Sequence, residues 1–324
     1  MKKKLVAVDC GKAETKVYAY SPDTGAVKSA IVKSRVEPVN SLVRLTLGED
    51  AHVVSIAKPD KDMKGEWTVG AIGGATSYSN SKKDSIHKIL TLTAIALAVD
   101  NGDSVIASVG CPLSVFFDDK AKSEYYNYIF PNGRVDVTID GQDHYFYIEK
   151  DNCLVIPESF GALFLYKDRF TDKTGIVDIG GLNVNASFFE EGTLDPFTSK
   201  TEKLGFYSIV SLLRNRLNAY CDASFNDTEV GFALRQGYMT GYKDTAKIVE
   251  EVLDIQARRI KELLKEWDLT GMTMIFIGGT SKLLQKQLEK YFGKDIFIPD
   301  DANLINSRGF LKAMLEGYGY KAKI

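Results

Sequence analysis

Two segments of the chain place an acidic residue between a hydrophobic strand and a glycine turn. The first reads Val6-Ala7-Val8-Asp9-Cys10-Gly11, and the second reads Ile176-Val177-Asp178-Ile179-Gly180-Gly181. After each turn an alternating strand resumes, at 15–20 and at 184–189. Backbone N–H groups in such turns bind phosphate oxygens, and a neighbouring carboxylate holds a hydrated cation. If the two turns face each other, we expect them to bind a polyphosphate together with its cation.

A third candidate is the carboxylate of Glu158, which follows Pro157 at the expected start of a helix. Small residues come directly after it and permit close packing. In one interpretation Glu158 is an ordinary acid that the helix dipole stabilises. In the other, it faces a cleft between two domains and polarises a water molecule. The residue pattern alone leaves both interpretations open.

Composition limits the classes of function. The chain has 324 residues, enough for two domains, and 44% of them are hydrophobic and 26% charged, as in ordinary globular proteins. A net charge of −2 gives no basic region for nucleic acid. We therefore expect no direct nucleic-acid binding, and any contact with DNA would need a partner protein.

Cysteines and apolar segments indicate the compartment. The four cysteines lie far apart without metal-ligand spacing, which argues against a zinc site or a disulfide framework. The N-terminus enters a strand almost at once and lacks the sections of a signal peptide, and no apolar run approaches the length of a membrane span. The sequence predicts a cytoplasmic protein without membrane contact.

The two halves of the chain repeat one order of elements, which predicts an α/β fold. Hydrophobic alternation in the first half predicts strands at 4–9, 15–20 and 26–32. A helix-length apolar segment follows at 86–99, and a further strand is predicted at 104–110. The second half repeats the order of three strands and a helix, at 175–178, 184–190, 193–198 and 204–220. The remaining segments predict a long helix, a buried strand and two more helices, at 242–267, 272–277, 281–291 and 302–315.

Five motifs in their order carry a family resemblance. They are Asp9-Cys10-Gly11 with Thr15-Lys16, then Pro157-Glu158-Ser159-Phe160-Gly161-Ala162, Asp178-Ile179-Gly180-Gly181, Ile277-Gly278-Gly279-Thr280 and Asn306-Ser307-Arg308-Gly309. This order resembles the two phosphate loops, two connectors and adenosine loop of the actin, sugar-kinase and heat-shock-chaperone ATPase superfamily. The segment 108–117 is similar to the strand and Pro-Leu segment of bacterial plasmid-segregation actins of the ParM type.

The resemblance implies an architecture. It consists of two ribonuclease-H-like, actin-like domains with mixed five-stranded sheets flanked by helices, and a nucleotide cleft lies between them. The expected domain I comprises 1–153 plus 303–324, with a small insertion at about 33–83. The expected domain II comprises 154–302.

The resemblance also assigns roles by motif position. Asp9 and Asp178 would lie near Mg²⁺, through its waters, and Glu158 with Asp178 would form the catalytic pair that orients the attacking water. The predicted contacts to the phosphates of ATP or GTP are Gly11, Lys12, Thr15, Lys16, Gly180, Gly181 and Asn183. Gly278, Gly279 and Thr280 would flank the nucleoside.

Three of these assignments keep an alternative. Lys16 has the spacing of an exposed lysine on a strand as well as that of a phosphate ligand. Lys12 either adds a charge to the phosphate loop or turns away from it. Glu229 is a candidate ribose or base ligand, or only a helix-start acid.

The implied function is an ATP or GTP hydrolase that polymerises into filaments and drives plasmid DNA segregation. Its partners would be further copies of itself and a DNA-binding adaptor on a centromere-like plasmid site. The alternative is a small-molecule kinase, for a sugar or an acid, on the same fold. A chaperone-like switch is disfavoured, because no substrate-binding domain follows the ATPase core.

Overall fold

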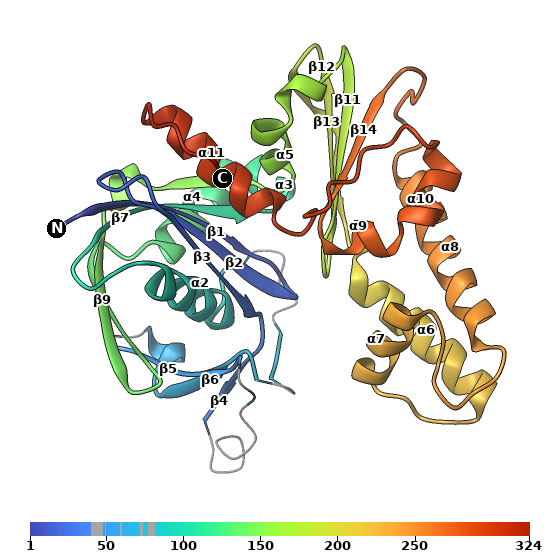
Figure 1. Ribbon diagram of the computed structural model, residues 1–324, viewed down its shortest axis with the longest axis horizontal. Coiled ribbons are helices and arrows are strands. Elements are labelled where there is room, and N and C mark those ends of the chain that lie inside the picture. Colours follow the sequence, from blue (N-terminus) through green and yellow to red (C-terminus); the bar gives the residue numbers. More distant parts are fainter. Residues whose placement is uncertain (40–47, 49, 59, 72–73, 77–81) are drawn as a thin grey trace. The chain divides into compact units, whose positions relative to one another are not determined.

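The protein is described by a computed structural model over residues 1–39, 48, 50–58, 60–71, 74–76 and 82–324. The chain forms two compact units (Figure 1). The first unit comprises Met1–Leu165 with Leu304–Ile324, and the second comprises Tyr166–Asn303. Within the described ranges, every helix is too short or too polar to cross a membrane.

The first unit is built on one large mixed sheet. Its elements are β1 (Lys3–Cys10), β2 (Glu14–Tyr20), β3 (Val27–Lys33), β4 (Val36–Pro38), β5 (His52–Ile56), η1 (Lys61–Met63), β6 (Glu66–Val69), α2 (Ser85–Ala98), β7 (Ser104–Cys111), α3 (Leu113–Phe116), α4 (Asp119–Ile129), β8 (Gly133–Ile139), β9 (Gln142–Ile148), η2 (Lys150–Asn152), β10 (Leu154–Pro157), α5 (Phe160–Leu165) and α11 (Ile305–Gly317). The strand order is β3-β2-β1-β7-β9-β8-β5-β6-β4, and β10 pairs with β7. β1 runs antiparallel to β2 and parallel to β7, so the ends of β1, β7 and β10 share one edge.

Alternation along β1 gives this sheet two buried faces. Val6 and Val8 pack in a core with the buried residues of α2, whereas Leu5 and Ala7 pack with Phe310 and Met314 of α11. α2 and α11 accordingly cover opposite faces (Figure 1). Both faces need cover, because the middle of β1, Leu5 to Val8, is apolar on both sides.

The second unit has a smaller sheet. Its elements are η3 (Lys167–Arg169), β11 (Lys173–Ile179), β12 (Val184–Glu190), β13 (Thr193–Glu202), α6 (Phe206–Cys221), α7 (Asp227–Gln236), α8 (Thr245–Leu263), β14 (Thr273–Ile277), α9 (Gly279–Leu283) and α10 (Gln285–Phe292). The strand order is β13-β12-β11-β14, with β11 parallel to β14. One core joins this sheet to α6, α8 and α10, including Val177, Leu213 and Ile260.

The α/β class and the repeated order of elements are confirmed, and two sheet details differ. The five strands β3-β2-β1-β7-β10 form the expected sheet of the first unit, and β9, β8, β5, β6 and β4 extend it. The predicted insertion at 33–83 thus supplies β4 to β6, and its residues 40–47, 49, 59, 72–73 and 77–81 lie outside the described ranges. In the second unit the fifth position is only an isolated bridge between Ile275 and Phe297.

Two predicted boundaries also differ. The segment 154–165 was expected to open the second domain, yet it belongs to the first unit, because β10 pairs with β7. The expected helix at 281–291 is two helices, α9 and α10, which meet at Leu284. Leu284 is fully buried, so the chain turns there to direct it into the core.

Candidate functional site

The first glycine turn connects β1 to β2. The N–H of Gly11 donates to the Glu14 carbonyl oxygen at 3.1 Å, which closes the turn. The strand register places Asp9 opposite Lys16, and Lys16 Nζ lies 3.9 Å from Asp9 Oδ2. Lys16 is only 8% exposed, which excludes the exposed-lysine interpretation. The turn therefore presents a buried cation beside a buried carboxylate.

Burial shapes the charge of this turn. It raises the pKa of Asp9 above its ordinary value, with opposition from the nearby Lys16 ammonium. Burial also lowers the pKa of Lys12, and the positive charge of Lys82 lowers it further. The Lys12 side chain is 9% exposed, and its contact with phosphate stays a prediction. Burial disfavours the charged form of each group, so a bound ligand of opposite charge would favour that form.

Thr15 requires a correction. It was predicted to contact nucleotide, but its side chain is fully buried. Its hydroxyl lies 2.9 Å from Ser34 Oγ and donates to Cys10 Sγ at 3.3 Å. The side chain packs behind the turn because residue 15 alternates with Lys16, so its polar group faces the core.

The second glycine turn repeats the backbone of the first. The Gly180 N–H donates to the Asn183 carbonyl oxygen at 2.9 Å, and Asp178 lies opposite Asn185. Both side chains are buried, and the Asn185 carboxamide oxygen accepts a hydrogen bond from Thr201 at 2.8 Å. An amide thus occupies the position that Lys16 has in the first turn.

Neighbouring segments of the second unit hold this turn tightly. A Cβ on Gly278, where φ is +86°, would lie 2.4 Å from Asp178 Oδ1. Thr280 Oγ1 donates to the Gly180 carbonyl oxygen at 3.0 Å. The N–H groups of Phe206 and Tyr207, at the start of α6, donate to the carbonyl oxygens of Gly180 and Gly181. Five of the predicted motif residues therefore form one cluster: Asp178, Gly180, Gly181, Gly278 and Thr280.

Glu158 lies on the turn between β10 and α5. Its N–H donates to the Cys111 carbonyl oxygen at 2.7 Å, which attaches it to the end of β7. Ser159 follows with φ of +81°, a strained conformation for a residue with a Cβ, and its N–H donates to Asn306 Oδ1. α5 has only six residues. Glu158 is thus held by the strand end and by the connector residue Asn306, and not simply placed in a helix dipole.

The two connectors meet closely within the first unit. A Cβ on Gly309 would lie 2.2 Å from the Gly161 carbonyl oxygen, and one on Gly161 would lie 2.4 Å from the Ile305 carbonyl oxygen. α5 and α11 can approach this far only because both positions are glycine. The 157–162 and 306–309 motifs are therefore in direct contact.

Lys82 is a site residue that was not predicted. Its side chain is 2% exposed, and its Nζ forms an ion pair with Glu158 Oε1. Burial alone would lower the pKa of Lys82, but the Glu158 and Asp9 carboxylates outweigh it, and the pKa is raised. The available signal was weak: two lysines and an aspartate precede α2, and nothing local distinguishes Lys82 from Lys83.

Comparisons with known proteins agree with this geometry. The family model described as actin-like proteins, N-terminal domain, matches residues 7–161, a range that contains both the Asp9 turn and Glu158. Residues 7–161 are therefore similar to the N-terminal domain of actin-like proteins. A comparison with curated protein sequences found no match.

Three solved structures illustrate the shared actin-like fold. A ParM filament from Clostridium botulinum has a TM-score of 0.78 and 17% identity, with coverage of 98% of this chain and 100% of that chain. An archaeal actin homologue in complex with ADP gives 0.74 and 18%, with coverage of 98% and 100%. An Alp12 filament gives 0.67 and 23%, also with coverage of 98% and 100%. The chain thus has an actin-like fold and spans the full length of these chains.

Glu229 has a local hydrogen-bonding partner, Asn226. Asn226 begins α7, and its side chain accepts from the Glu229 N–H, while Glu229 Oε2 accepts from the Asn226 N–H at 2.8 Å. This reciprocal pair is a capping box, which satisfies N–H groups at a helix start. The structure therefore accounts for Glu229 by the helix-start interpretation, and a nucleotide contact stays a prediction.

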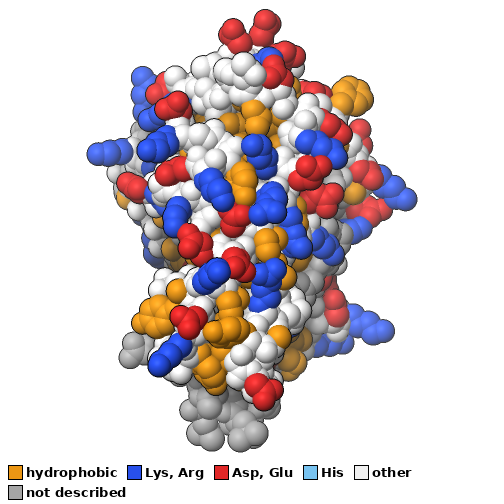
Figure 2. Space-filling model, turned by 90° about the vertical axis from the view of Figure 1, so that its right-hand side faces the viewer, with side chains coloured by type: hydrophobic (Ala, Val, Ile, Leu, Met, Phe, Trp, Pro, Cys, Tyr) orange, Lys and Arg blue, Asp and Glu red, His pale blue; other side chains and the backbone are white. Residues whose placement is uncertain are grey.

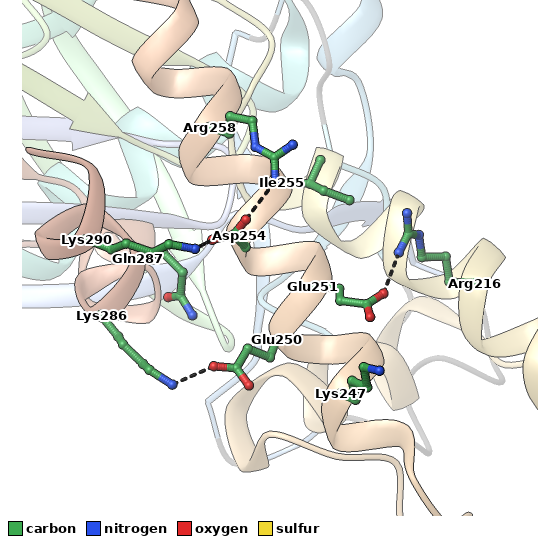
Figure 3. Close-up of a pocket in the computed structure, with 10 residues that line it drawn as sticks. All are labelled: Arg216, Lys247, Glu250, Glu251, Asp254, Ile255, Arg258, Lys286, Gln287 and Lys290. Carbon is green, nitrogen blue, oxygen red and sulfur yellow. Dashed lines mark hydrogen bonds and ion pairs between the residues drawn. The ribbon is translucent and has the colours of Figure 1, made fainter.

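A separate surface pocket of the second unit contains none of the predicted residues. It is lined from α6, α8 and α10 (Figure 3), and its carboxylates are already paired. Lys286 lies 2.6 Å from Glu250, Lys290 lies 2.6 Å from Asp254, and Arg216 lies 3.2 Å from Glu251. These ion pairs brace the helices against one another.

The donor groups fit the nucleotide and cation that the superfamily implies. Among the described residues, His, Cys, Asp and Glu side chains form no cluster of three that would bind a metal directly. Asp9 is instead a single buried carboxylate with a raised pKa, and Asp178 is buried against Gly278. Each turn thus supplies one carboxylate, a donor that suits Mg²⁺, and binding of the cation stays a prediction.

Proposed function

We propose that this actin-like protein binds ATP or GTP with Mg²⁺, hydrolyses the terminal phosphate and assembles into filaments while nucleotide is bound. The observation that carries the proposal is the repeated turn, in which Gly11 and Gly180 make the same backbone hydrogen bond beside Asp9 and Asp178. Such a pair of turns has the chemistry to hold phosphates and a hydrated cation. The structures of similar fold include two filaments and one ADP complex. They support extending filament assembly and nucleotide binding to this chain.

The residues of the two glycine turns would act on the phosphates and on the waters of the cation. Lys16 and the N–H groups of the first turn would donate to phosphate oxygens, and Lys12 would add a positive charge. Asp9 and Asp178 would accept hydrogen bonds from waters of the cation. When bound, Mg²⁺ neutralises negative charge on the phosphate oxygens.

Glu158 would orient the attacking water. Its carboxylate would accept a hydrogen bond from the water and receive its proton as the oxygen attacks the terminal phosphorus, while the bond to the nucleoside diphosphate breaks. The held turn around Glu158 suits this role, since phosphoryl transfer depends on positioning more than on acid strength.

The proposal extends to plasmid DNA segregation in the cytoplasm. A DNA-bound adaptor would capture the filament, so the protein itself would not contact nucleic acid. Consistent with this, Lys and Arg side chains are interspersed with Asp and Glu over the face drawn in Figure 2. The net charge of −2 agrees with a need for such an adaptor.

Sedimentation with and without ATP or GTP tests the proposal, with release of inorganic phosphate measured in parallel. We expect pelleting that depends on nucleotide and phosphate release that needs no acceptor. Glu158→Gln should still form filaments while phosphate release falls by about 10²-fold or more. Hydrolysis that requires an added sugar or acid would favour the kinase alternative, and the absence of pelleting with either nucleotide would contradict the filament claim.

A further inference from the structure

Lys82 is the most enclosed charged group at the predicted site. It precedes α2, and its ammonium reaches three separate segments of the first unit. It donates to the Cys10 carbonyl oxygen at 3.2 Å, to the Gly110 carbonyl oxygen at 3.2 Å and to Glu158 Oε1. These acceptors lie at the end of β1, near the end of β7 and on the turn after β10.

The number of acceptors matches the chemistry of a lysine. An ammonium group carries three N–H donors and no acceptor, and here each donor has one named partner. With three bonds in different directions, the ammonium is fixed relative to the strand ends. It is therefore a poor candidate for a mobile cation that swings onto a phosphate.

Side chains behind the strand end support the same point. The Gly110 carbonyl oxygen also accepts a bond from the Tyr125 hydroxyl at 3.3 Å, and Tyr125 lies 2.8 Å from His87 Nε2. Tyr125 and His87 are buried and come from α4 and α2. The Gly110 carbonyl that orients Lys82 is thus braced from two helices.

The neighbouring residue shows that this placement is specific. Lys83 follows directly in the chain, but its ammonium forms an exposed ion pair with Glu124 of α4. A general need for positive charge at this end of α2 would be met by either lysine. Lys82, in contrast, contacts Glu158, a residue of the proposed hydrolytic machinery.

We propose that Lys82 is a positioning residue for hydrolysis, which holds the Glu158 carboxylate in place from a fixed point on the strand ends. This inference rests on the proposed function, because it assigns Lys82 a part in the step that Glu158 performs. Lys82 does not contact the reacting atoms. Its effect passes through the Lys82–Glu158 ion pair.

The test compares Lys82→Met with Glu158→Gln, with the double variant and with Lys83→Met as the matched control. Phosphate release gives kcat and KM, and nucleotide affinity and thermal unfolding report whether each variant is folded. We expect Lys82→Met to lower kcat by about 10²-fold, the lower range for loss of a general base, and to change KM by less than about threefold. Lys83→Met should match the wild type.

The double variant decides whether Lys82 acts through Glu158. It removes both charges of the pair and leaves no unpaired buried carboxylate, so it should fold even if Lys82→Met does not. Its kcat should lie within about twofold of Glu158→Gln alone, because the two residues act as one unit. A further loss of about tenfold or more would show an independent role and overturn the inference.

Other outcomes separate the inference from the proposed function. A Lys82→Met variant that keeps its kcat, or raises it, would contradict the positioning role while the function stands. A loss confined to KM and affinity would also contradict it, since Lys82 would then be a nucleotide ligand. A wild type that releases no phosphate from ATP or GTP would overturn the proposed function and this inference together.

Discussion

The turn at Asp9 and the turn at Asp178 share a backbone and differ in charge. In both, the N–H of a glycine donates a hydrogen bond to the carbonyl oxygen of the residue three positions later, which closes the turn. In both, the aspartate lies opposite a polar residue of the next strand. That opposite residue is Lys16 in the first turn and Asn185 in the second. The first turn is surrounded by lysines, whereas the second is held by Thr280, Gly278 and the start of α6.

The difference teaches that backbone geometry and ligand chemistry are specified separately. The glycine and the hydrogen bond create the turn, and the residue opposite the aspartate decides which charge it presents. The first turn has cations for phosphate oxygens. The second has rigid packing and neutral amides, so its contribution should depend on shape more than on charge.

The largest expected effect comes from crowding the second turn. Gly278→Ala places a Cβ 2.4 Å from Asp178 Oδ1 at a φ of +86°. Strain and overpacking together should lower the free energy of unfolding by about 3 kcal/mol or more. Gly11→Ala is the matched variant in the first turn, where the nearest atom is the Glu14 carbonyl oxygen at 2.9 Å, and about 1 kcal/mol is expected.

Chemical denaturation followed by circular dichroism measures both changes. Equal losses for Gly278→Ala and Gly11→Ala would show that the second turn is not held more tightly than the first. That result would remove the distinction between a packed turn and a charged turn.

A smaller effect comes from removing the charge of the first turn. Lys16→Met should weaken ATP or GTP binding by about 10- to 100-fold, the range for a hydrogen bond to a charged group. Asn185→Ala should weaken nucleotide binding only a few-fold, because the variant loses a neutral hydrogen bond, the one from Thr201. Isothermal titration measures both, and Lys28→Met, an exposed lysine on β3, serves as the control. Similar losses for Lys16→Met and Asn185→Ala would contradict the contrast in charge.

The smallest effect separates the units by pH. All three histidines lie in the first unit, and burial, followed by the charge of Lys82, holds the pKa of His87 well below its ordinary 6.5. Below pH 6.5 the unfolded chain therefore binds a proton that the folded chain does not, and stability falls as pH decreases. The expected loss from His87 is about 1.4 kcal/mol per pH unit.

Denaturation at pH 7.0, 6.5, 6.0 and 5.5 measures this slope, and His87→Gln should reduce it by that amount. A variant with the slope of the wild type would show that the buried histidine is not the cause. The second unit has no histidine, so its own unfolding should not show this contribution.

Sequence patterns captured what neighbouring residues encode. The strands on either side of Asp9 and Asp178 alternate, and the glycine after each aspartate marks the turn, so both hairpins were predicted close to their actual positions. Glu158 was found because a proline, an acid and small residues stand together. The Cys111 and Asn306 contacts that hold its turn come from distant parts of the chain, and its role toward a water molecule stays a proposal.

Lys82 and the boundary at 154–165 could not be predicted in this way. Lys82 and Lys83 have the same neighbours in the sequence. Lys82 is buried where it pairs with Glu158, 76 residues later in the chain, whereas Lys83 is exposed. The boundary depends on β10 pairing with β7, which is a choice of strand neighbour and not a periodicity. Thr15 was assigned to nucleotide because its motif matched, although strand alternation directs it inward.

The close contact of α5 with α11 also affects the order in which the two units can fold during synthesis. The second unit is continuous in the chain, so it can fold once residue 303 has left the ribosome. The first unit cannot complete its core until residues 304–324 emerge, because Phe310 and Met314 cover the face of β1 that bears Leu5 and Ala7. The Asn306 bond that holds the turn after Glu158 forms at that same late stage. The carboxylate proposed for hydrolysis is thus set in place only after the whole second unit has been synthesised.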